Sequence, residues 1–89
     1  MVAKVKAILK TVSDTYPLEL CYLQNNSPFD VSVALKIKSK PFQRRRKRRN
    51  NARQIYLALC DESEAVGLRS IIEHHSPDDR YLSVEFVKQ

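Results

Sequence analysis

The sequence predicts an α+β fold: one small domain, residues 1–89, with a mixed β-sheet of about four or five strands. One or two helices are expected on one face of the sheet, together with an arginine-rich loop. Three observations support this prediction. The chain has 89 residues, of which 43% are hydrophobic, enough for one core. Several short segments alternate between apolar and polar residues, as half-buried strands do. One longer segment has its apolar residues at helical spacing.

Three segments show the period-two alternation of strands that bury one face. Residues 31–38 show it most clearly, and we expect Val33 and Leu35 in the core. Residues 16–23 and 80–88 alternate in the same way. The link "QNNSPFD", which joins segment 16–23 to segment 31–38, is rich in turn-forming residues. The residues expected to point inward are Tyr16, Leu18, Leu20, Tyr22, Val31, Val33, Leu35, Ile37, Leu82, Val84 and Phe86.

Residues 62–75 are predicted to form a helix. Asp61 is placed to cap its N-terminus, and Glu64 follows as the second member of a capping box. Ser76-Pro77 would end the helix. Its apolar stripe, which includes the expected core residue Ile72, consists of Ala65, Leu68, Ile71 and Ile72.

Two segments fit both a strand and a helix. For residues 2–12 we favour a strand, because it would gather three lysines on its exposed face; a helix with Val2, Val5, Ile8, Leu9 and Val12 on one side fits equally well. Residues 54–60 are predicted to be a buried strand with Leu57 in the core, followed by the helix and the last strand as a βαβ unit. The alternative is one long helix that begins inside the arginine run and keeps the spacing of Ala52, Ile55, Leu59, Glu62 and Val66. The residue pattern shows no internal repeat.

The positive charge is concentrated in one segment. The net charge is +6, and residues 44–53 hold seven of the 16 basic residues and no acidic one. The rest of the chain, with nine basic and ten acidic residues, is close to neutral. A neutral domain with one cationic segment is typical of a scaffold that presents a charged arm. We therefore predict an exposed arginine-rich arm over residues 41–54.

The arm has the composition of a nucleic-acid-binding segment. Arginine binds phosphate with two hydrogen bonds and stacks on bases, and amide side chains hydrogen-bond base edges. Lysines on the exposed face of strand 31–38, together with Lys4, Lys6 and Lys10, would extend the contact as a phosphate track. We expect RNA slightly more than DNA, because flexible arginine-rich segments adapt to irregular RNA. The predicted contact residues are Arg44, Arg45, Arg46, Lys47, Arg48, Arg49, Asn50, Asn51, Arg53, Gln54, Lys36, Lys38 and Lys40.

Other functions fit the sequence less well. The main alternative is a protein-interaction or assembly module whose basic run is a nuclear-import signal or a dock for an acidic partner. Attachment to an anionic membrane is disfavoured because residues 41–54 have no apolar face. We expect no enzyme activity, cofactor or metal, since no phosphate-binding glycine loop or zinc-ligand spacing is present. No apolar run is long enough for a membrane span. A homodimer would help to cover the sheet, and we expect an intracellular location, nuclear in a eukaryote or virus and otherwise cytoplasmic.

Overall fold

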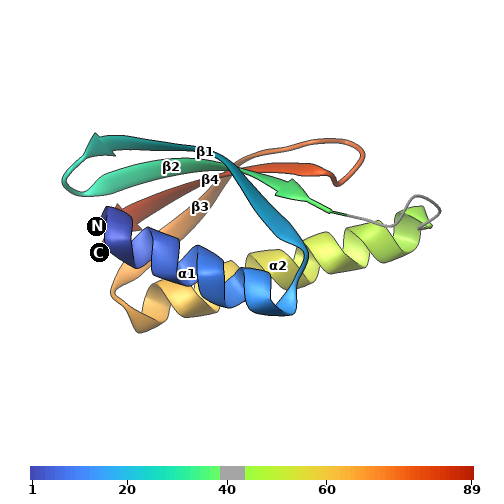
Figure 1. The fold of residues 1–89 in the computed structure, drawn as a ribbon, viewed down its shortest axis with the longest axis horizontal. Helices are drawn as coiled ribbons and strands as arrows, with labels where there is room; N and C mark the ends of the chain where they lie inside the picture. The colour runs from blue at the N-terminus through green and yellow to red at the C-terminus, as the bar shows by residue number, and fades with distance from the viewer. Residues whose placement is uncertain (39–43) are drawn as a thin grey trace.

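The protein folds as a four-stranded antiparallel sheet with two helices on one face, as described by a computed structural model for residues 1–38 and 44–89 (Figure 1). The strand order is β1-β2-β4-β3. The predicted α+β class is thus confirmed, whereas the predicted mixed sheet with a parallel βαβ unit is wrong, because every neighbouring pair is antiparallel. The elements are α1 (Val2–Thr15), β1 (Leu18–Ser27), β2 (Asp30–Ile37), α2 (Arg45–Ala65), β3 (Leu68–His75) and β4 (Tyr81–Lys88).

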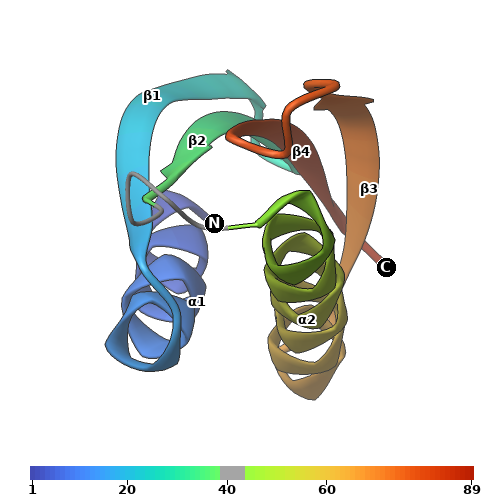
Figure 2. The same cartoon turned by 90° about the vertical axis from the view of Figure 1, so that its right-hand side faces the viewer.

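The two halves of the chain repeat the order helix, strand, strand. Their inner strands, β2 and β4, pair at the centre of the sheet with Val33 opposite Val84. On either side of this pair, Val31 lies opposite Phe86 and Leu35 opposite Leu82. A two-fold rotation about the central pair therefore exchanges the two flanking pairs, and β1 and β3 become the two equivalent edges (Figure 2). The repeat is one of topology and register, which the residue pattern does not reveal.

The core lies between the sheet and the helices. The two central strands supply alternate buried residues, and the predicted core positions Val33 and Leu35 are confirmed. The edge strand β1 contributes no fully buried side chain. The buried apolar residues are Val5, Ile8, Leu9, Val12, Val31, Val33, Leu35, Ile37, Ala52, Ile55, Leu59, Leu68, Leu82, Val84 and Phe86.

The first segment is a helix, so the favoured strand over residues 2–12 is wrong. The buried residues of α1 follow the alternative helical pattern, and its lysines are exposed. The helix is favoured because the apolar inner face of the sheet must be buried against other elements. With α1 beside α2, apolar side chains from two helices close over the inner face of the sheet.

The second helix replaces two predicted elements. α2 runs through residues 54–60 and ends at Ala65, so the predicted strand there and the predicted helix 62–75 are both wrong. Gly67 follows with φ 77°, a conformation that glycine adopts without strain, and β3 begins at the next residue. Asp61 lies inside α2 and does not cap a new helix. Leu57 points away from the core with 58% of its surface exposed, and Ile72 is half-buried in β3.

The predicted strands at 16–23 and 80–88 are confirmed as β1 and β4, except that Tyr16 is the C-cap residue of α1 and β1 begins at Leu18; one change of face also occurs. In β1, Leu20 lies opposite Leu35 but Tyr22 lies opposite Ala34, because the register shifts between them. An extra residue in one strand reverses the alternation beyond it. Tyr22 therefore points to the open face of the sheet, which is the face away from the helices, and not into the core.

Candidate nucleic-acid interface

The predicted arginine-rich arm is helical over most of its length. Residues 44–54, which we call the basic turns, comprise the N-cap residue Arg44 and the first three turns of α2. The predicted loop is therefore wrong over residues 45–54, while residues 41–43 lie outside the described part of the chain. Arginine, lysine, glutamine and alanine all favour helices, and the basic turns contain no glycine or proline. Helical structure is thus favoured locally and continues into the packed part of α2.

The basic turns project past the end of α1 (Figure 1). Tyr16, just after α1, donates a hydrogen bond from its hydroxyl to Oε1 of Gln54 at 3.4 Å, which marks where α1 stops along α2. Beyond that point, towards the core, Ile55 and Leu59 are fully buried against the sheet. The basic turns are therefore an extension of a helix that the core holds in place.

Most of the predicted contact side chains in the basic turns are exposed. About 100° separates successive residues of an α-helix, so consecutive cations are distributed around the whole helix. Arg48 and Asn51 are half-buried, because each lies one turn before a buried residue, Ala52 and Ile55 respectively, on the side that faces the fold. Their spacing of four residues from Ala52 and Ile55 is the sequence signal that separates these two residues from the rest. The exposed side chains are Arg44, Arg46, Lys47, Arg49, Asn50, Arg53 and Gln54.

The ends of α2 carry charges opposite to those that the helix dipole favours. The first turn has no acidic residue, the last turn has no basic residue, and Arg44 makes no side-chain capping hydrogen bond. Asp61, Glu62 and Glu64 lie near the C-terminus instead. Cations at an N-terminus and anions at a C-terminus destabilise a helix. Neutralisation by a bound polyanion would therefore stabilise the basic turns.

The open face of the sheet has the opposite charge balance. Residues paired across neighbouring strands share a face, which places the outward residues of all four strands together. A hydrogen bond between Glu73 and Glu85, with burial and the nearby charge of Asp30, raises the pKa of Glu85. This face is unsuited to phosphate, since carboxylates outnumber cations by four to two. Its charged residues are Glu19, Asp30, Glu73, Glu85, Lys36 and Arg69.

The predicted lysines do not form one track along the sheet. Lys36 is exposed on the open face opposite Glu19, and Lys38 is exposed just after β2. Lys40 lies outside the described residues. The remaining three, Lys4, Lys6 and Lys10, lie on α1. The described cations therefore gather on the helix layer, and most densely on the basic turns.

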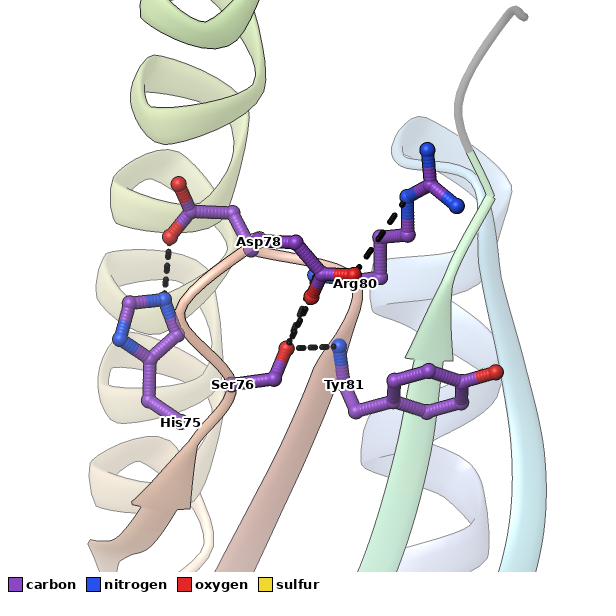
Figure 3. Close-up of polar contacts among 6 residues, drawn as sticks. His75, Ser76, Asp78, Arg80 and Tyr81 are labelled. Atoms are coloured by element: carbon purple, nitrogen blue, oxygen red, sulfur yellow. Dashed lines mark hydrogen bonds and ion pairs between the residues drawn. The ribbon is translucent and has the colours of Figure 1, made fainter.

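The β3–β4 turn is held together by polar contacts (Figure 3). The hydroxyl of Ser76 donates to Oδ1 of Asp78 at 2.7 Å and accepts the backbone N–H of Tyr81 at 2.9 Å. The hydrogen bond from Ser76 is the main reason why the pKa of Asp78 is lowered. Asp79, which is buried, pairs with the His75 side chain across the turn.

This turn also contacts α2. The Tyr56 ring packs edge-on against the His75 ring, with 5.7 Å between ring centres. Burial, with a smaller effect of the Asp79 charge, raises the pKa of Tyr56 to about 12. The Tyr56 hydroxyl oxygen is buried and has no hydrogen-bond partner among the described residues. The contact holds α2 at Tyr56, two residues after the end of the basic turns.

Other kinds of site find less support in the described residues. No group of three or more His, Cys, Asp or Glu side chains within residues 1–38 and 44–89 is arranged to hold a metal ion. Both cysteines are free thiols. In the same ranges, neither helix is long and apolar enough to cross a membrane. Comparison of the chain with protein-family models, curated proteins and solved structures gave no match.

Proposed function

We propose that the protein binds RNA or DNA through the basic turns of α2. The observation that carries this proposal is the separation of charge between two surfaces. The exposed end of one helix holds seven of the 16 basic residues within eleven positions, while the open face of the sheet carries more carboxylates than cations. A polyanion is attracted to the first surface and repelled by the second.

The exposed side chains are of two kinds: cations that suit phosphate contacts and amides that suit base contacts. Arginine and lysine neutralise phosphates and release condensed counterions, which provides affinity without sequence preference. The amides of Asn50 and Gln54 are exposed on the same turns and have the chemistry for base contacts. The phosphate contacts would come from Arg44, Arg46, Lys47, Arg49 and Arg53.

A pair of charge-matched variants tests this proposal. In the first variant, Arg44, Arg46, Lys47, Arg49 and Arg53 are all changed to Gln. In the second, Lys4, Lys6, Lys10, Lys36 and Lys38 are changed to Gln, which removes the same net charge from other exposed positions. Binding is measured by fluorescence anisotropy over a series of salt concentrations. Circular dichroism checks that both variants fold.

We expect the first variant to lose nucleic-acid binding and the second to keep most of it. If five phosphates are contacted, the slope of log affinity against log salt falls by about 3.5 on single strands and about 4.5 on duplex DNA in the first variant. Equal losses in the two folded variants would show that net charge alone matters. Unchanged binding in the first variant would remove the basic turns from the binding surface.

A further inference from the structure

We infer that the basic turns of α2 lie in the major groove of duplex DNA. This inference rests on the proposed function and names the kind of nucleic acid that the geometry fits. An α-helix with its side chains is about 10–12 Å across, and the major groove of B-DNA is about 12 Å wide. The corresponding groove of A-form RNA is too narrow for side chains to read. A ready-formed helix therefore matches duplex DNA better than duplex RNA.

The distribution of cations around the helix also fits a groove. One side of the basic turns faces the fold through Arg48 and Ala52. The helical repeat places Lys47 and Arg49 on the two flanks, where the phosphates of both strands would lie. Cations on both flanks suit a helix between two backbones, whereas a helix lying on one strand needs cations on one side only.

The side opposite the fold carries groups that read base edges. Arg46, Asn50 and Arg53 follow one another at spacings of four and three residues, so they share one face. In the major groove, arginine pairs with guanine and asparagine with adenine, each through two hydrogen bonds. All three side chains are exposed.

The basic turns can contact only a short stretch of DNA. Residues 44–54 span about 15 Å along the helix axis, which corresponds to roughly four base pairs. Further along α2, the exposed residues Asp61 and Glu64 carry negative charge that repels phosphate. Because the basic turns extend past α1 in Figure 1, they reach a groove without obstruction from the other helix.

The first test compares four probes at one salt concentration. These are a 20-base-pair DNA duplex of random sequence, an RNA duplex with the same pool of sequences, an RNA hairpin with an internal bulge, and single-stranded DNA. We expect the DNA duplex to bind at least tenfold more tightly than each of the other three. Equal or tighter binding to any RNA or to the single strand would overturn the groove inference and leave the proposed function standing. Absence of binding to all four would overturn both.

The second test separates base contacts from phosphate contacts. A selection from random DNA duplexes gives the preferred bases, and the Asn50→Ala and Lys47→Ala variants are then compared on the selected site and on random duplexes. We expect Asn50→Ala to lose roughly tenfold in discrimination at one base pair. We expect Lys47→Ala to weaken binding to all duplexes alike and to reduce the salt slope by about 0.9. A uniform loss in Asn50→Ala, or no selected preference in the unmodified protein, would overturn the base-reading face.

Discussion

The two helix-strand-strand halves have the same plan and differ mainly in their helices. Leu9 and Leu59 are both buried, each six residues before the end of its helix, and each helix is followed by two residues before its strand begins. However, α1 has 14 residues and α2 has 21. The seven additional residues of α2 are at its N-terminus and form most of the basic turns. The shared positions build the fold, and the extension supplies the charge.

This difference separates the residues that build the core from those that we propose bind nucleic acid. The part of α2 that matches α1 buries apolar residues, whereas four of the six side chains described in the extension are exposed and the other two, Arg48 and Asn51, are half-buried. Substitutions at matched positions should therefore change stability in both halves. Substitutions in the extension should change binding while affecting stability weakly.

The largest stability effect is expected at matched core positions of the central strands. Leu35 in β2 and Phe86 in β4 are both almost fully buried. Changing Phe86 to Ala should cost about 3–5 kcal/mol and changing Leu35 to Ala about 2–5 kcal/mol, because each leaves a cavity in the shared core. Chemical denaturation measures both. A loss below about 1 kcal/mol in only one variant would mean that the two halves do not share one core.

Leu57→Ala is the matched control for these core variants. Leu57 is a similar apolar residue, but 58% of its surface is exposed on α2. Its truncation should change stability by no more than about 0.5 kcal/mol. A core-sized loss would restore the sequence-based placement of Leu57 in the core.

A smaller gain in stability is expected at the start of α2. Changing Arg44 to Ser supplies the missing capping side chain and should stabilise the protein by about 1 kcal/mol. The same variant loses one cation, so the salt slope of nucleic-acid binding should fall by about 0.7–0.9. Arg44→Ala is the control, since it removes the charge without adding a cap. Equal stability of the Ser and Ala variants would mean that a capping side chain at residue 44 does not stabilise the first turn of α2.

The smallest effect on stability is expected at alkaline pH, and we predict only its direction. Because the pKa of Tyr56 is raised to about 12 in the folded protein, the unfolded chain loses this proton at lower pH than the folded protein does. The stabilisation is complete below the ordinary tyrosine pKa of about 10 and is lost as the pH rises from there to about 12. Denaturation at pH 9 and pH 11 should therefore show a steeper decline for the unmodified protein than for Tyr56→Phe. Parallel declines would show that Tyr56 does not contribute.

The sequence by itself determined the fold class, the strands β1, β2 and β4, and the place of the charge. Alternation in β2 and β4 identifies their buried face because both lie at the centre of the sheet, with helices on one side only. The seven cations of residues 44–53 lie within ten positions of the chain, so their concentration does not depend on the tertiary structure. For the candidate site, the sequence therefore predicted which residues are concentrated but not which of them face outwards.

Only the tertiary structure decided the conformation of residues 2–15 and 54–75. In the first segment, the same apolar residues fit a strand or a helix, and the need to cover the sheet selects the helix. In β3, Leu68 and Ile72 match both helical and strand spacing, and pairing with β4 selects the strand. The register shift in β1 turns Tyr22 outwards through pairing with β2. In each case, the deciding contact joins residues far apart in the chain. The local periodicity of the sequence carries no information about such contacts.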